Sequence, residues 1–207
     1  MKKEEKITAL SIALTTSVGV IMLYSSVIFN SVAFTAAGVD ALVDTITSAG
    51  VLTGLAISRH RADKGHPYGH GQAEMLASLF IGALLVFAGV RISFSALENI
   101  YSPATIVLSI ETFLAPLIAI LIFCPLGIMK VKWGKRLGHP AIVADGYHTL
   151  SDSISAFAVI LGMLAVWAGY LWADGMVALG ISVVIIYWAF SIGSKAINVL
   201  MVASPEK

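Results

Sequence analysis

The sequence predicts an all-α membrane protein, a bundle of six transmembrane helices, and three observations carry that prediction. Of its 207 residues 58% are hydrophobic and only 12% are charged, with a mean hydropathy of +0.90, whereas about 25% of the residues in a soluble domain are charged. Six stretches reach the roughly 20 apolar residues that cross a bilayer. These stretches are continuously apolar, which excludes the alternating pattern of a transmembrane barrel. No basic stripe indicates a nucleic-acid partner.

The expected spans, in chain order, are about 7–29, 32–58, 74–99, 104–129, 141–172 and 175–201. The first follows a charged N-terminus, as in a signal peptide, but its apolar run is too long for one, so we expect a retained helix. The third begins at Glu74, whose carboxylate favours a helix N-terminus. The fifth is longer than a bilayer requires and is therefore expected to tilt or to project from the membrane.

The positive charges alternate between the two sides of these spans. Lys and Arg precede the first span, lie between the second and third, lie between the fourth and fifth, and follow or end the sixth: Lys2, Lys3, Lys6, Arg59, Arg61, Lys64, Lys130, Lys132, Lys135, Arg136, Lys195 and Lys207. The opposite connections carry none. By the positive-inside rule we expect both termini in the cytoplasm of a cell-membrane protein. We expect one transport domain over 1–207, without a cytoplasmic domain after it.

Four ionisable residues fall inside two of the spans. Asp40 and Asp44 are four residues apart in the second span, and His148 and Asp152 are four apart in the fifth. This spacing puts each pair on one helix face. Because a charge in the hydrocarbon region costs at least about 2.5–3.5 kcal/mol, both pairs need a partner, and a shared cation would neutralise them.

The residue types indicate which cation would fit. Three carboxylates and one imidazole suit a tetrahedral Zn²⁺, whereas Mg²⁺ and Ca²⁺ prefer shells of oxygen alone. Fe²⁺, Co²⁺ or Cd²⁺ could occupy the same set, since affinity order alone does not decide selectivity. Depth along the helices, counted at about 1.5 Å per residue, lets the two pairs meet near the middle of the membrane.

Three other ionisable positions leave alternatives open. Asp145 shares the face of His148 and either orients that imidazole from behind or sits at the water boundary with no role in metal binding. Arg91 and Glu111 lie toward the outer halves of their spans. They are expected to serve the structure, by pairing with each other or by reaching the interface.

A second cluster of metal-ligating residue types lies in the Gly/Pro-rich connection between the second and third spans. Asp63, His66 and His70 fall within eight residues and can converge on one metal, although a polar connection is often only solvated. Glu74 closes this run, and its place at a helix N-terminus is the simpler explanation for it.

Three motifs in this order resemble the cation diffusion facilitator family of zinc and iron efflux antiporters. They are Asp40-x-x-x-Asp44, the run from His66 through His70 to Glu74, and Ala-Asp-x-x-His148-x-x-x-Asp152. The resemblance implies a homodimer that exchanges a divalent metal for protons by alternating access. It also implies a transport site of Asp40, Asp44, His148 and Asp152, and a second site of Asp63, His66 and His70.

The chain departs from the pattern of that family in three ways, one of which is that no His-rich loop lies between its fourth and fifth spans. It ends at Lys207, whereas most members continue into a ferredoxin-like cytoplasmic domain. Gln72 stands where some bacterial members have a lysine, so the interlock that this lysine forms at a dimer interface is not expected.

Two other function classes compete with transport. A membrane metalloenzyme needs an open coordination position for water, which four convergent ligands do not leave. A non-transporting partner subunit would have no reason to keep charge in lipid. Efflux of Zn²⁺, or next of Fe²⁺, against protons is therefore the expected function, and no enzymatic activity is expected.

Overall fold

The computed structural model describes residues 3–29, 32–67, 69–101, 110–170 and 172–201. Within them lie six helices and no strand: α1 (Lys3–Phe29), α2 (Val32–Ser58), α3 (Ala73–Tyr101), α4 (Ile110–Leu137), α5 (Pro140–Trp167) and α6 (Ala173–Leu200). Each is long and apolar enough to cross a membrane. Helices of this length extend roughly 40 Å, beyond a hydrocarbon core of about 30 Å. The predicted six-helix bundle is confirmed, and the chain is a multi-pass membrane protein.

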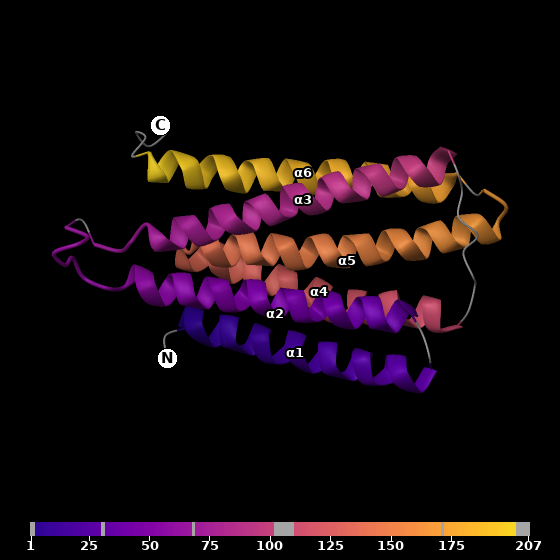
Figure 1. Cartoon of the computed structure of the whole chain (residues 1–207), viewed down its shortest axis with the longest axis horizontal. Coiled ribbons are helices and arrows are strands. Elements are labelled where there is room, and N and C mark those ends of the chain that lie inside the picture. Colours follow the sequence, from indigo (N-terminus) through magenta and orange to yellow (C-terminus); the bar gives the residue numbers. More distant parts are fainter. Residues whose placement is uncertain (1–2, 30–31, 68, 102–109, 171, 202–207) are drawn as a thin grey trace.

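The helices pack as three close pairs, with α1 against α2, α4 against α5 and α3 against α6. The first two pairs join sequence neighbours, whereas α3 and α6 lie side by side although two helices separate them in the chain (Figure 1). α1 begins and α6 ends at the end of the bundle that carries the connection from α2 to α3. This connection is exposed over most of its length and is called here the 59–72 connection.

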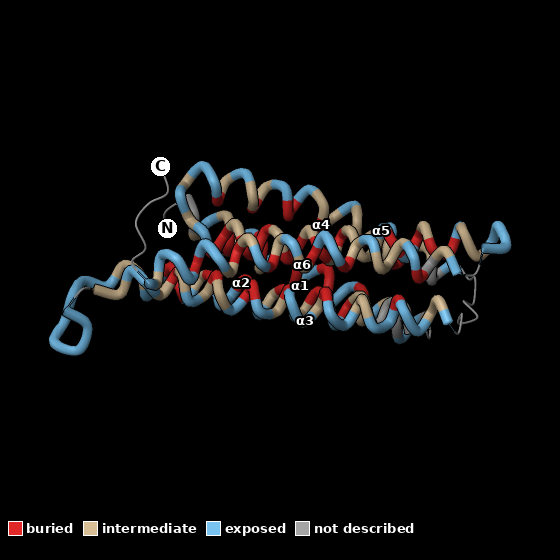
Figure 2. The backbone as a smooth tube through the Cα atoms, turned by 90° about the horizontal axis from the view of Figure 1, so that it is seen from above, coloured by how far each residue is buried: buried red, intermediate tan, exposed pale blue. Residues whose placement is uncertain are grey.

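Buried apolar residues form two clusters on the inward sides of the helices, shown in red in Figure 2. One joins α2, α3, α5 and α6 through residues such as Leu55, Leu85 and Ile185. The other joins α1, α2 and α4 through Met22, Ala41 and Phe123. Many large apolar side chains point outward instead, as lipid-facing residues should.

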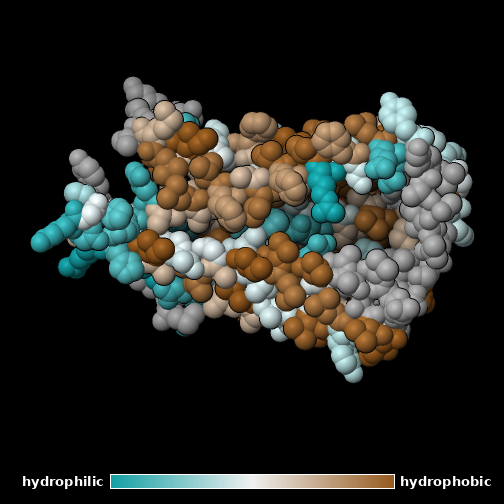
Figure 3. Space-filling view, viewed as in Figure 1, coloured by the Kyte–Doolittle hydropathy of each residue, from teal (hydrophilic) through white to brown (hydrophobic). Residues whose placement is uncertain are grey.

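The outer surface separates into a polar end and an apolar middle. In Figure 3 hydrophilic residues gather around the 59–72 connection, whereas most of the face along the helices is apolar. A hydrophilic patch interrupts that face partway along the bundle. Asp40 of α2 and Arg91 of α3 are exposed ionisable residues within these helices.

Glycines allow α4 and α5 to approach closely. A Cβ atom on Gly146 of α5 would lie 2.7 Å from the backbone nitrogen of Val131, and one on Gly134 of α4 would lie 2.9 Å from that of Val143. Small residues at such crossings are typical of membrane helices, which associate mainly by close packing. The approach also brings Lys130 beside the helix that carries Asp145 and His148.

The structure corrects the predicted end of the fourth span. α4 continues to Leu137, so Lys130, Lys132, Lys135 and Arg136 are helical residues and not part of a loop. The helix ends at Gly138, whose φ of 73° is left-handed and suits a residue without a Cβ. The apolar run stops at about residue 129, but the helix is extended by residues that propagate helices well. The fifth span ends earlier than predicted, at Trp167, but the 28 residues of α5 are still more than a bilayer requires.

We expect Gly146→Ala to destabilise the protein by about 1–3 kcal/mol, since the added methyl meets backbone that cannot move alone. Gly180→Ala is the matched control, because nothing lies within 4 Å of a Cβ at that α6 position. The control should be neutral or slightly stabilising, as alanine favours helix over glycine. Thermal unfolding of both variants in detergent measures this. Equal midpoints for the two variants would contradict the close α4–α5 crossing.

Candidate functional site

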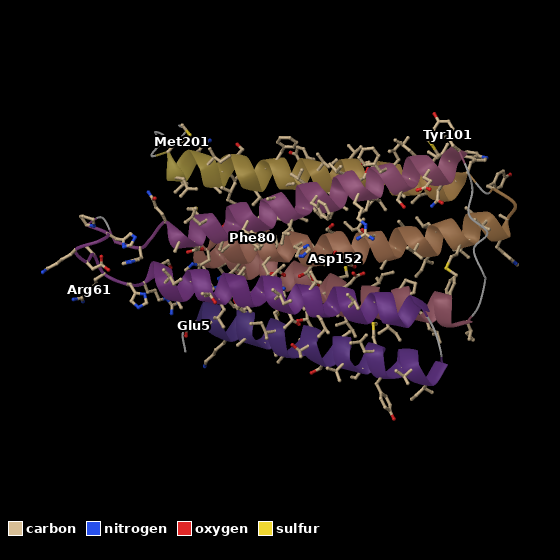
Figure 4. All side chains as sticks on the ribbon, in the orientation of Figure 1. Glu5, Arg61, Phe80, Tyr101, Asp152 and Met201 are labelled. Carbon is tan, nitrogen blue, oxygen red and sulfur yellow. The ribbon has the colours of Figure 1, made fainter. Side chains whose placement is uncertain are left out.

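Asp44, His148 and Asp152 come together midway along the bundle, where Figure 4 labels Asp152. One ligand atom from each of the three lies within 4.8 Å of the others. His148 Nε2 is 3.4 Å from Asp44 Oδ1, and His148 Nδ1 is 3.7 Å from Asp152 Oδ2. The i, i+4 spacing on α5 and the packing of α2 on α5 create this set, named here the buried triad.

The polar atoms of the buried triad lack ordinary partners. Asp44 Oδ2, both ring nitrogens of His148 and Asp152 Oδ2 are buried and have no hydrogen-bond partner among the described residues. Such atoms are costly in an apolar interior unless something satisfies them. Carboxylate oxygens and imidazole nitrogens that converge at this spacing are suited to hold a divalent transition-metal ion.

Asp40 is the fourth predicted ligand, and it lies outside the buried triad. It is exposed on α2, one turn from Asp44, and interacts electrostatically with Arg91 and His148. The pairing of Arg91 with Glu111, one of the two expectations for these residues, involves the side chain of Glu111, which lies outside the described residues. The structure thus brings three of the four predicted residues together and leaves Asp40 beside them.

Asp145 forms a buried ion pair that the sequence did not predict. Its Oδ2 is 2.9 Å from Lys130 Nζ, and each residue is 1% exposed. Ser48 donates to both oxygens of Asp145, while Lys130 also donates to Ser48 Oγ and to Thr149 Oγ1. These residues are called here the buried ion-pair network, and they tie α2, α4 and α5 together.

Neither sequence alternative for Asp145 holds within the described contacts. The carboxylate is not at the water boundary, and its bonds go to Lys130 and Ser48 and not to the His148 ring. The partner that local sequence does not indicate is Lys130, which stands at the end of an apolar run, where the sequence predicts a loop. A long helix placed its ammonium inside the bundle instead.

Exposure of the polar interior changes along the bundle. The side chain of Asp152 is 33% exposed, and Asp40, one turn beyond Asp44, is exposed. On the other side of the buried triad, toward the 59–72 connection, Ser48, Lys130, Asp145 and Thr149 are all buried. The triad is therefore covered by buried residues on the side of that connection, and the residues on its other side are more exposed.

The 59–72 connection brings Asp63, His66 and His70 together at the polar end. Their ligand atoms lie within 4.8 Å of one another, and each histidine has a ring nitrogen 3.6 Å from an Asp63 oxygen. The backbone N–H groups of His66 and Gly65 donate to Asp63 Oδ1. The His66 bond above all lowers the pKa of the Asp63 carboxyl from 3.8. This exposed set could hold a metal as well.

Glu74 has a second role that its position alone did not show. It lies in the first turn of α3, as predicted, but its carboxylate also accepts from the Ala141 N–H and is 3.1 Å from His139 Nδ1. It therefore stabilises the first turn of α5, where Pro140 occupies an early helix position. The two partners lie more than 60 residues apart, so no local pattern indicated them.

Comparison with known proteins identifies the family of the chain. The family model of the cation efflux transmembrane domain matches residues 8–201. The chain belongs to the cation diffusion facilitator family.

Several curated members of this family resemble the chain over most of its length. It is 29% identical to an uncharacterized transporter of Methanocaldococcus jannaschii over 100% of this chain and 73% of the relative. It is 31% identical to the manganese efflux system protein MneS of Bacillus subtilis over 93% of this chain and 66% of the relative. It is 33% identical to the cation-efflux pump FieF of Yersinia pestis over 83% of this chain and 57% of the relative. The chain thus spans less than two thirds of MneS and FieF.

We expect Lys130→Met to lower the free energy of unfolding by about 3–5 kcal/mol, because it leaves the buried Asp145 carboxylate uncompensated. Asp145→Leu should lower the free energy of unfolding by a similar amount, because it leaves the buried Lys130 ammonium without its carboxylate. The double variant should recover most of that loss, since an apolar pair of similar volume often replaces a buried ion pair without cost. Thermal unfolding in detergent measures all three. Losses that simply add would show that the two residues act independently.

For the 59–72 connection we expect metal binding to which Asp63 contributes a charged carboxylate at neutral and mildly acidic pH. The backbone hydrogen bonds lower the pKa of Asp63, so the charge of its carboxylate is lost only when the pH falls below about 3.8. Asp63→Asn should therefore weaken Zn²⁺ binding by about the same factor at about pH 5 and about pH 7.

His66→Ala with His70→Ala should remove most of the binding, because each histidine supplies a ligand atom. His60→Ala is the control, since this ring contacts His70 edge-on and the Ile57 carbonyl but is not one of the three converging residues. Calorimetric Zn²⁺ titrations in an Asp152→Asn background isolate this site from the buried triad. Unchanged Zn²⁺ binding by the double histidine variant would contradict the assignment.

Proposed function

We propose that this chain exports a divalent transition-metal cation, which binds in the buried triad of Asp44, His148 and Asp152. The observation that carries the proposal is the convergence of three ligating side chains whose buried polar atoms have no other partner. Asp40 stands one turn away and is proposed as the fourth ligand, reached by a change of its side-chain rotamer. Its electrostatic interaction with His148 supports this role.

Zn²⁺ is the substrate we propose first, and Fe²⁺ next. One nitrogen and up to three oxygens form a tetrahedral set that suits Zn²⁺, and the imidazole makes the site softer than an all-oxygen shell. Co²⁺ and Cd²⁺ fit the same ligands. The similarity to a protein named for manganese efflux makes Mn²⁺ a necessary member of any test panel.

Protons are the proposed counter-substrate. Carboxylates and imidazole bind metal only when deprotonated, so metal and protons compete for the same atoms. When the metal leaves, crowded carboxylates in an apolar setting favour taking up protons over remaining charged. A protonated site then returns across the membrane without carrying several bare negative charges through lipid. Inward proton flow would thereby drive metal outward.

The direction of transport follows from the proposed orientation. The positive-inside rule places the 59–72 connection and both helix ends beside it in the cytoplasm of a cell-membrane protein. The buried ion-pair network lies on that side of the buried triad, which supports the proposal that the described state is closed to the cytoplasm. A homodimer is proposed as the working unit on the family resemblance.

The test is metal uptake by proteoliposomes, with a panel of Zn²⁺, Fe²⁺, Co²⁺, Cd²⁺ and Mn²⁺ and internal pH recorded together. We expect an imposed proton gradient to accelerate Zn²⁺ flux and the metal to move protons the other way. Asp44→Asn and Asp152→Asn should reduce the flux to that of protein-free vesicles, because each removes a ligand charge. Asp63→Asn, at the exposed site, is the matched control and should keep measurable flux.

Two results would overturn parts of this proposal. Retained transport in a folded Asp44→Asn or Asp152→Asn variant would reject the buried triad as the transport site. Flux that ignores the pH gradient and moves no protons would make the protein a passive facilitator. Thermal unfolding of each variant separates a lost ligand from a lost fold.

A further inference from the structure

A cavity of about 290 Å³ lies at the end of the bundle where α4 and α6 end and α3 and α5 begin. It is separate from both metal-ligating sets, and none of its lining residues belongs to them. Four helices contribute to its wall. That wall is mainly apolar, and it includes Val143, Ile192, Ala196 and Val199.

Two lysines supply the charge at this cavity. Lys135, in the last turn of α4, and Lys195, on α6, both line it and are exposed. Lys135 Nζ donates to Tyr147 Oη at 3.3 Å. Neither lysine has a carboxylate partner among the described residues. Tyr147, which also lines the cavity, adds a hydroxyl but no opposing charge.

The acidic residue beside this cavity in sequence does not neutralise the lysines. Glu74 precedes the lining residue Met75, but it is buried and accepts from His139 and from the Ala141 N–H. No acidic residue lines the cavity in the part of the chain that the structure describes. Two positive charges therefore face an apolar hollow at one end of the membrane-spanning bundle.

This combination fits one kind of ligand better than others. A small soluble anion would satisfy the lysines but gain nothing from the apolar wall, and an uncharged lipid would do the reverse. Basic pockets between transmembrane helices near the membrane surface suit lipid head groups. We propose that the cavity binds an anionic phospholipid, with its phosphate at Lys135 and Lys195 and its first acyl carbons along Val143, Ile192 and Val199.

The test uses the full chain in detergent and follows the unfolding midpoint during titration with phosphatidylglycerol, phosphatidylcholine or glycerophosphate. Phosphatidylglycerol should protect the protein at much lower concentration than phosphatidylcholine. Glycerophosphate, which lacks acyl chains, should not protect. Equal protection by glycerophosphate would mean that phosphate alone binds, and it would overturn the lipid assignment.

Variants locate the effect. Each lysine near an anionic head group contributes about fivefold in affinity, so Lys135→Met with Lys195→Met should weaken phosphatidylglycerol binding about thirtyfold. Lys132→Met is the matched control, because this exposed lysine of α4 does not line the cavity. Equal loss in the control would show diffuse attraction to charge and reject the site.

Two further variants keep the proposal testable if the double methionine variant fails to fold. Lys135→Arg with Lys195→Arg preserves both charges and should keep the preference for phosphatidylglycerol. Ser191→Leu keeps both lysines but fills the cavity that Ser191 lines, and it should abolish the preference. Undiminished phosphatidylglycerol binding by a folded Ser191→Leu variant would overturn the proposal, whatever the result with the lysines.

Discussion

A charge inside a membrane must be matched by an opposite charge, a proton or a metal ion, and the polar interior of this bundle is organised by that constraint. The Lys130–Asp145 pair meets it internally, because the ammonium and carboxylate are 2.9 Å apart and both are buried. The buried triad does not, since several of its atoms have no partner. The difference between these neighbouring sets separates a structural function from a proposed transport function.

The pair and the triad also depend on each other through the helices that carry them. Asp145 and His148 are three residues apart on α5, and Ser48 and Asp44 are four apart on α2. Asp145 therefore accepts from Ser48 of α2 and from Lys130 of α4. These bonds fix the position of α2 relative to α5 about one turn from the triad. The close α4–α5 crossing at Gly146 lets Lys130 reach that point. Packing of small residues thus determines the geometry of a charged site.

Local sequence pattern predicted the parts of the site that local spacing determines. The i, i+4 pairs on α2 and α5 and the short run from Asp63 to His70 were recognisable because their members lie within one turn or one connection. Lys130 with Asp145, and Glu74 with His139, join distant residues, so no spacing indicates them. The positive-inside pattern predicts Lys130 in a loop, whereas α4 carries its basic residues within the helix. Asp40 shares the helix face of Asp44, as expected from the spacing. The sequence alone does not show that Asp40 is exposed while Asp44 is buried.

Closure on one side sets an energetic condition for the proposed alternating access. For a metal ion to pass between the buried triad and the end that carries the 59–72 connection, the helices joined by the buried ion-pair network have to separate. Parting Lys130 from Asp145 without water would expose each to the cost of an unpaired buried charge, about 3–5 kcal/mol. Water that enters as the helices part reduces this cost by solvating both groups. The Lys130–Asp145 pair therefore stabilises the closed arrangement as long as water is excluded from that side. Once water enters, the pair no longer stabilises closure, so a fully closed and a fully open state are both more stable than a partly opened one.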